Sequence, residues 1–180
     1  DREQVMVLME QMIRLVFQAT AGVELPAPFP RMAYAEAMGR YGSDKPDLRF
    51  GMPLHDLQDF ASKTEFKVFR ETLAKGGMVK AIVVKGGAEI SRSRIDALGE
   101  TAKGFGAKGL AWVKIVGDGQ LESVIAKFLD ARSLLAAVPD AQTGDLLLFV
   151  ADKPKVVHDV LGRLRLLLAE ERNLIDQKAW

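Results

Sequence analysis

The residues best suited to chemistry lie in one charged stretch, RYGSDKPDLRF, at residues 40–50. Gly42 favours a positive φ and Pro46 fixes its own φ, so a constrained loop is predicted here. Lysine and arginine side chains held by such a loop can bind phosphate groups or pair with carboxylates. The alternative is a structural connector whose polar groups satisfy one another. The candidate functional residues are Arg40, Ser43, Asp44, Lys45 and Arg49.

A second group of cations lies at the two ends of a helix predicted over residues 91–103. Arginine and lysine side chains that converge on one surface can hold the phosphates of RNA. The chain as a whole has a net charge of +1 and therefore shows no general attraction for polyanions. Solubility is the competing explanation for these charges. The candidate RNA-contacting residues are Arg92, Arg94, Lys103 and Lys108.

Metal-ion and histidine-based catalysis have little support in the sequence. The chain has two histidines, His55 and His158, and no cysteine. His158 lies off the apolar stripe of its predicted helix, so we expect its ring to be in solvent. No spacing gathers the several ligands that a metal site needs. We therefore predict no catalytic residue and no metal ligand in this chain.

The glycine-rich segment GFGAKG at residues 104–109 has the composition of a phosphate-binding loop. It follows a predicted helix and precedes a predicted strand, whereas phosphate-binding loops follow a strand and open a helix. Residues 106–109 also have the GXXG spacing with which KH domains clamp nucleic acid. We favour a tight helix-to-strand connection that needs glycine at a positive φ.

Two helices and a stiff spacer are predicted before the charged loop. Apolar residues at steps of three and four predict an amphipathic helix over residues 1–20, with a capping box from Asp1 and Gln4 and a stop at Gly22. The prolines of residues 25–30 predict an extended spacer. A short helix over residues 34–40 follows, although Ala33 gives it no side-chain cap. Part of the first helix's apolar face is expected to need a partner outside the chain.

After the loop, residues 54–60 are predicted to form one or two helical turns. Residues 66–151 then predict the order strand, strand, helix, strand, strand, helix, strand. The predicted strands are 66–68, 78–84, 110–116, 124–129 and 146–150. Ser91 and Asp130 are expected to cap the two helices, and Asp152 to cap a final long helix. The predicted fold class is α+β, a two-layer sandwich with helices on one face of a mostly antiparallel sheet.

The bulk composition is that of a soluble domain. The chain has 180 residues, of which 48% are hydrophobic and 27% charged. No apolar run reaches the roughly 18 residues that a membrane span needs, and we find no signal peptide. The absence of cysteine fits a reducing compartment, so a cytoplasmic location is expected. Both ends look cut, and we expect the chain to be an excerpt of a longer protein.

Several of these segments also carry a family resemblance. FPRMAYAEAM at residues 29–38 and RYGSDKPDLRF at residues 40–50 resemble bacterial-type aspartyl-tRNA synthetases just before the large insertion of that family. Further matches follow in the same order, and together they cover essentially the whole chain. They are FKVF at 66–69, AKGLAW at 107–112, AKFL at 126–129, GDLLLF at 144–149 and LID at 174–176.

The resemblance implies a GAD-like insertion domain at residues 51–151, between catalytic-core segments at 1–50 and 152–180. The parent would be a class II aspartate–tRNA ligase, a cytoplasmic homodimer that uses ATP with Mg and charges tRNA. We find no match to the family's ATP-holding and closing motifs, so the chain alone is predicted to be inactive and to hold no cofactor. Its partners would be the catalytic core of the same protein and tRNA, with no membrane. The alternative is a stand-alone module that binds RNA or protein without catalysis.

Overall fold

The computed structural model describes residues 1–178. They fall into two compact units, one containing residues 1–33 and the other containing Tyr34–Gln177. The second unit includes the charged loop and the last long helix as well as the predicted insertion. The division of a parent protein at residues 50 and 151 stays a prediction.

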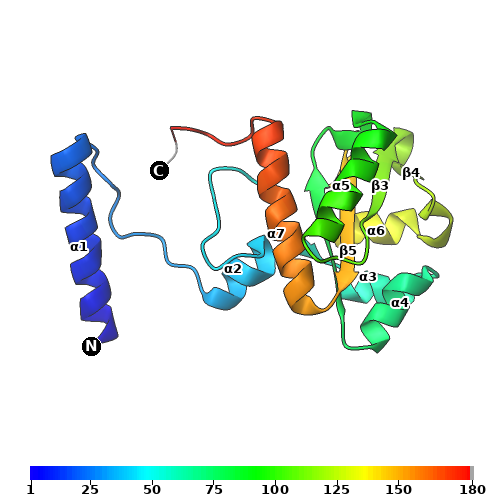
Figure 1. The fold of residues 1–180 in the computed structure, drawn as a ribbon, viewed down its shortest axis with the longest axis horizontal. Coiled ribbons are helices and arrows are strands. Elements are labelled where there is room, and N and C mark those ends of the chain that lie inside the picture. Colours follow the sequence, from blue (N-terminus) through cyan, green and yellow to red (C-terminus); the bar gives the residue numbers. More distant parts are fainter. Residues whose placement is uncertain (179–180) are drawn as a thin grey trace. The chain divides into compact units, whose positions relative to one another are not determined.

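The first unit is built on helix α1 (Arg2–Ala21) (Figure 1). The capping box of Asp1 and Gln4 is formed, and Gly22 ends the helix in the left-handed conformation, as predicted. Polar side chains of the helix hold the segment that follows it. The Phe29 N–H, for example, donates to Glu10 Oε1 at 3.0 Å.

Helix α1 buries none of its residues within this unit. Several of its apolar side chains are exposed: Val5, Leu8 and Leu15 are 60%, 65% and 70% exposed. A helix with so wide an exposed apolar face normally packs on another surface. That this face binds a partner outside the chain therefore stays a prediction, and the exposed apolar side chains of α1 support it.

The second unit contains one sheet of five strands, which confirms the α+β class and the antiparallel sheet. The strands are β1 (Leu54–Asp56), β2 (Met78–Val84), β3 (Ala111–Val116), β4 (Gln120–Glu122) and β5 (Leu146–Asp152). Their order is β1-β2-β5-β3-β4, and every neighbouring pair is antiparallel. The long apolar strands β2 and β5 lie inside the sheet, where both of their faces can be covered.

Helices cover both faces of this sheet, which differs from the expected arrangement on one face. One core cluster joins Ile82 and Leu148 to α5 (Arg92–Gly104) and α7 (Pro154–Glu171). The other joins Val83 and Phe149 to α3 (Gln58–Lys63), α4 (Lys67–Ala74) and α6 (Ala131–Ala137). Because successive strand residues point to opposite faces, unbroken apolar runs in β2 and β5 require two covering layers (Figure 1).

Two predictions on the N-terminal side of the sheet are wrong. Residues 54–56 form strand β1 on the edge of the sheet, and the predicted helix is limited to α3. The strand predicted at residues 66–68 is instead the start of helix α4. Phe69 packs inside while Val68 is 51% exposed, so the buried side chains follow a helical spacing rather than an alternation.

Two further predictions fail around β4 and α7. The strand predicted at residues 124–129 is a turn with a short 3-10 helix at Ala126–Phe128, and strand β4 lies just before it. Asp152 belongs to β5 rather than capping α7, although its Oδ1 accepts a hydrogen bond from the Lys153 N–H at 2.8 Å. The caps predicted at Ser91 and Asp130 are both confirmed.

Candidate functional site

The charged loop follows helix α2 (Tyr34–Tyr41) and is held on α7 by one buried arginine, Arg165. Arg165 Nε donates to the Met52 carbonyl at 3.1 Å, and its Nη2 lies 2.7 Å from the Asp47 carbonyl. The same nitrogen also lies 3.2 Å from the Phe50 carbonyl and 3.1 Å from that of Gly51. The loop backbone, which pairs with no described strand, thus gains hydrogen bonds from a single side chain.

Two aromatic rings complete the setting of this guanidinium. It lies 4.0 Å from the ring centroid of Phe50 and 4.9 Å from that of Tyr41. Burial lowers the pKa of Arg165 from its ordinary value, while Tyr41 and Asp47 oppose that shift. Carbonyl dipoles and ring faces therefore stabilise the buried positive charge in place of a bound carboxylate.

Some of the predicted loop residues have side chains that bond to neighbouring groups, and others have side chains that are exposed without a partner in the described chain. Arg40 pairs with Glu36 at 3.0 Å, and the Ser43 hydroxyl accepts a hydrogen bond from the Lys45 N–H at 3.2 Å. Asp44 and Lys45 are exposed. Among the described residues, neither of these two side chains takes part in an ion pair or hydrogen bond. Lys45 is therefore the loop cation best placed to meet an external anion.

Arg49 is bound to a neighbouring carboxylate. Its Nη2 lies 2.8 Å from Asp47 Oδ2 and its Nε lies 3.0 Å from Asp47 Oδ1, which is a bidentate pair. The Arg49 guanidinium holds the pKa of Asp47 below its ordinary value. This pair stiffens the turn and leaves Arg49 less available than Lys45 for phosphate.

The predicted RNA-contacting residues are all ion-paired as well. Arg92 Nε lies 2.9 Å from Asp96 Oδ1, and Lys103 Nζ lies 2.7 Å from Glu100 Oε1. Arg94 pairs with Glu171 of α7. Lys108 has the longest of these ion pairs, because its ammonium lies 3.8 Å from Asp152 Oδ1.

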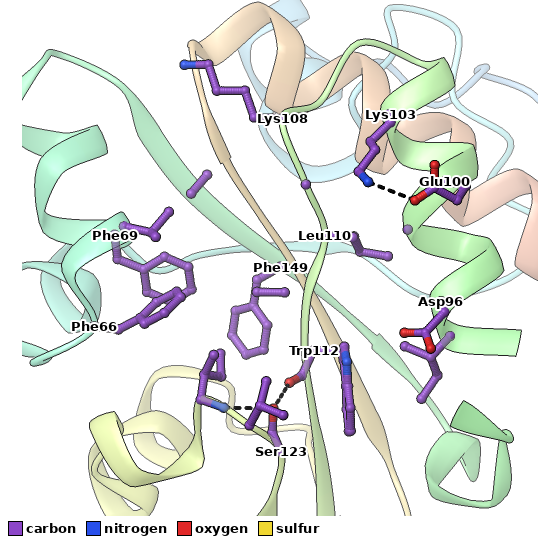
Figure 2. Close-up of a pocket in the computed structure, with 18 of the residues that line it drawn as sticks. Phe66, Phe69, Asp96, Glu100, Lys103, Lys108, Leu110, Trp112, Ser123 and Phe149 are labelled. Atoms are coloured by element: carbon purple, nitrogen blue, oxygen red, sulfur yellow. Dashed lines mark hydrogen bonds and ion pairs between the residues drawn. The ribbon is translucent and has the colours of Figure 1, made fainter. Parts of the chain in front are cut away.

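Three of these four cations lie around one cavity of about 590 Å³. The cavity follows the edge of β3, and its apolar floor includes Phe69, Phe149 and Trp112 (Figure 2). The Arg92 guanidinium lies 4.8 Å from the Trp112 ring centroid. Arg94 does not line the cavity, so the predicted group is split by the structure.

The histidines occupy half-buried positions near other charges. His55 Nε2 lies 3.2 Å from Asp140 Oδ1, and burial lowers the pKa of His55. His158 was expected in solvent, but its Nε2 is buried and has no hydrogen-bond partner among residues 1–178. Burial and the Lys80 ammonium lower the pKa of His158. The correction has a simple cause: α2 packs against this part of α7.

Stability is expected to fall as the pH drops from about 7.5 to 5.5. Both histidines have a pKa below the ordinary 6.5 in the folded state, so the unfolded chain binds more protons in this window. Urea unfolding at several pH values measures this slope. The double variant His55→Asn, His158→Gln should flatten it, and an unchanged slope would contradict the assignment. The carboxylates with a lowered pKa, Asp47 and Asp130, titrate below this window.

The segment 104–109 connects α5 to β3, and Gly106 has a φ of 106°, so it is a connector of the predicted kind. Within the described residues, no group of three or more histidine or acidic side chains forms a metal site. None of the described helices combines the length and the hydropathy that a bilayer span requires.

Sequence reasoning missed Arg165, which contributes most to the geometry of the loop. An available signal was an arginine inside the leucine-rich stripe of α7, in the run LGRLRLLL at residues 161–168. A cation on the buried face of a helix must find partners, so such a residue points to a buried polar contact. The sequence alone does not identify carbonyls more than 110 residues earlier as those partners.

Comparisons with known proteins agree over nearly the whole chain. Residues 69–161 match the GAD domain family. The chain is 47% identical over 182 residues to the aspartate–tRNA(Asp/Asn) ligase of Persephonella marina, covering 100% of this chain and 30% of that protein. The aspartate–tRNA(Asp/Asn) ligase of Bacillus subtilis is 55% identical over 181 residues, with 99% and 30% covered. The aspartate–tRNA ligase of Bacillus licheniformis is 53% identical over 180 residues, with 98% and 30% covered. The chain therefore spans about 30% of the length of these relatives.

Proposed function

The chain belongs to the GAD domain family, and on that premise we propose that it is the insertion domain, with flanking segments, of an aspartate–tRNA ligase. The parent activates L-aspartate with ATP and Mg and charges tRNA in protein synthesis, as a homodimer in the cytoplasm. This portion is accessory: it supports the catalytic core and does not hold ATP or aspartate itself.

The observation that carries this proposal is the extent of the match. The whole chain aligns at 47–55% identity with one continuous portion of proteins named as aspartate–tRNA ligases. The match is not limited to the GAD region, because it includes α1, the charged loop and the end of α7. A stand-alone interaction module would need no such flanking similarity.

The direct test compares the chain with its parent in aspartate-dependent ATP–pyrophosphate exchange. We expect exchange in the full-length protein and none above background in the 180-residue chain. Exchange by the chain alone would refute its accessory role. A reading frame that ends near both termini of the chain would instead favour the stand-alone module that binds RNA or protein.

Within this function, we propose that the charged loop provides the contact with tRNA phosphates. Lys45 supports this choice because it is exposed and unpaired within the described part of the chain, whereas all four cations of the α5 group take part in ion pairs. The test is a titration of the chain with aspartate tRNA at low and at physiological salt. Phosphate contacts predict an affinity that falls steeply with salt, and no binding at low salt would contradict the proposal.

The variant Lys45→Ala in the parent is expected to lower tRNA charging more than folding stability. The loop backbone is held by Arg165 and the Asp47–Arg49 pair, so removing an exposed ammonium leaves the fold within about 0.5 kcal/mol. Loss of one phosphate contact should reduce the slope of log affinity against log salt by about 0.9. Lys75→Ala, at another exposed lysine, is the matched control. Equal losses of charging and stability would show that the loop is purely structural.

A further inference from the structure

Half of strand β3 has no neighbouring strand on one side. β3 pairs with β5 through Ala111–Lys114, but with β4 only through Lys114–Val116. The Trp112 carbonyl points away from β5, because it accepts a hydrogen bond from Ser123 Oγ at 2.6 Å. The Trp112 N–H has the same direction, since both main-chain groups of a residue in an antiparallel strand point to one side. Within the described residues, no strand pairs with this half of the edge.

The cavity described above lies along this open edge. Its walls come from α4 on one face of the sheet and α5 on the other, as Figure 2 shows for Phe66 and Phe69 opposite Glu100 and Lys103. Apolar side chains beside it remain exposed, with Val68 at 51% and Val124 at 66%. The groove therefore offers the Trp112 N–H at its floor, beside a Trp112 carbonyl that already accepts a hydrogen bond from Ser123, and apolar contacts on its sides.

At one position of the α5 wall, a glycine leaves no side chain to project into the groove. Gly99 lies inside the helix and lines the cavity, and a Cβ added there would meet nothing within 4 Å. Glycine inside a helix costs about 1 kcal/mol relative to alanine, so the position is not one that helix stability favours. Its effect is to leave room for another main chain beside β3.

The charges of the groove differ along its length. The pairs Arg92–Asp96 and Lys103–Glu100 neutralise one another on the α5 wall. Lys108, at the start of the edge, has a side chain 85% exposed and no carboxylate oxygen closer than the 3.8 Å to Asp152. A negative charge on an incoming segment would therefore be stabilised at the Lys108 end.

We propose that this groove binds an extended peptide segment of a partner protein, which adds a strand to the open half of β3. The segment has apolar side chains at alternate positions, facing Phe66 and Val68 on one side, and a carboxylate that meets Lys108. Main-chain hydrogen bonds supply affinity in this mode of recognition, and the alternating side chains supply specificity. The inference rests on the geometry and charges of this groove and is independent of the activity of the parent.

The test is selection of a displayed library of random octapeptides on the 180-residue chain. Leucine at position 99 would extend into the groove, and its Cβ would meet nothing within 4 Å. Selected peptides should alternate apolar residues and carry an acidic residue at one end. By fluorescence anisotropy, Gly99→Leu should weaken them at least about tenfold, whereas Gly99→Ala should leave their affinity within about twofold.

Two further measurements make the outcome independent of how Gly99→Leu folds. Peptides N-methylated at alternate residues should lose binding, because the added strand needs its N–H groups. The amide signals of Leu110 and Trp112 should shift on binding of the unmodified peptide in NMR spectra. An unenriched library, equal affinity for Gly99→Leu, or unaffected N-methylated peptides would overturn the proposal. Displacement of the peptides by a single-stranded RNA oligonucleotide would overturn it in favour of a nucleic-acid site.

Discussion

The Arg165→Met variant is expected to lose about 3–5 kcal/mol of unfolding free energy, which would be a large fraction of the stability of an ordinary domain. Methionine keeps most of the apolar stem but removes every donor. Four carbonyls, from Asp47 to Met52, then lose the hydrogen bonds that Arg165 supplies. Each buried carbonyl left without a donor costs about 1–3 kcal/mol, and the loop edge recovers part of this from water.

Urea unfolding followed by circular dichroism measures this loss. Arg165→Lys retains the charge but not the planar fork, so it should recover only part of the stability. Arg163→Ala is the matched control, because this arginine lies two positions away on α7 and is exposed. It should cost less than about 1 kcal/mol, even though its guanidinium lies 5.2 Å from the Phe105 ring centroid. Equal effects at positions 163 and 165 would refute the anchoring role of Arg165.

The Arg165→Met variant also distinguishes the role of the loop conformation from the role of the Lys45 side chain. Arg165 touches main-chain carbonyls and ring faces, so its loss should free the loop without altering Lys45 itself. In a parent enzyme, Arg165→Met should therefore impair tRNA charging at temperatures where the fold still persists. The defect would resemble that of Lys45→Ala, although one residue is buried and the other exposed.

The sequence was most informative where burial and local chemistry agree. Strand β2 was predicted at the residues it occupies, because β-branched side chains alternate between two buried faces. The caps at Ser91 and Asp130 follow from side chains that bond backbone N–H groups three residues later. Such features depend on a few neighbouring residues, so they are visible before the fold is known.

The sequence was least informative where the local structure depends on a contact with a residue that is distant in the sequence. Strand β1 exists because its three residues pair with β2, and nothing in its composition requires a strand. The turn after β4 depends on Ser123, whose hydroxyl bonds to the Trp112 carbonyl and accepts the Ile125 N–H. Phe66 and Val68 suggested alternation, yet α4 buries Phe69 one helical turn after Phe66.

The candidate sites show the same contrast. The pairs Arg92–Asp96 and Glu100–Lys103 have helical spacings of four and three, so their mutual neutralisation could be read from the sequence. The pair Arg94–Glu171 could not, because it joins α5 to α7 across 77 residues. The groove beside β3 was likewise hidden, since its walls come from α4 and α5 and meet only in the folded sheet.

The Gly42→Ala variant is expected to lose about 2–5 kcal/mol of unfolding free energy. Gly42 has a φ of 71°, and an added Cβ would collide with the His158 carbonyl oxygen and lie 3.1 Å from Gly162 Cα. The substitution therefore combines a left-handed backbone with a collision between the end of α2 and α7. Gly76→Ala provides the control, because Gly76 has a φ of 73° but nothing within 4 Å. It should show the conformational cost alone, about 1–2 kcal/mol, and equal losses at the two positions would contradict a close approach.

Glycines within helices offer an independent check of the same contact. Gly162 lies inside α7, and its added Cβ would be 3.0 Å from the carbonyl oxygens of Tyr41 and Gly42. Alanine is favoured over glycine in a helix by about 1 kcal/mol, so Gly99→Ala in α5 should stabilise the chain. Gly162→Ala should destabilise it, because overpacking of about 1–3 kcal/mol exceeds that gain. If glycine-to-alanine substitution raises the stability at position 99 and lowers it at position 162, the close approach lies at α7, where the charged loop is held. A stabilising Gly162→Ala would mean that the loop yields without cost, and that Arg165 does not hold it rigidly.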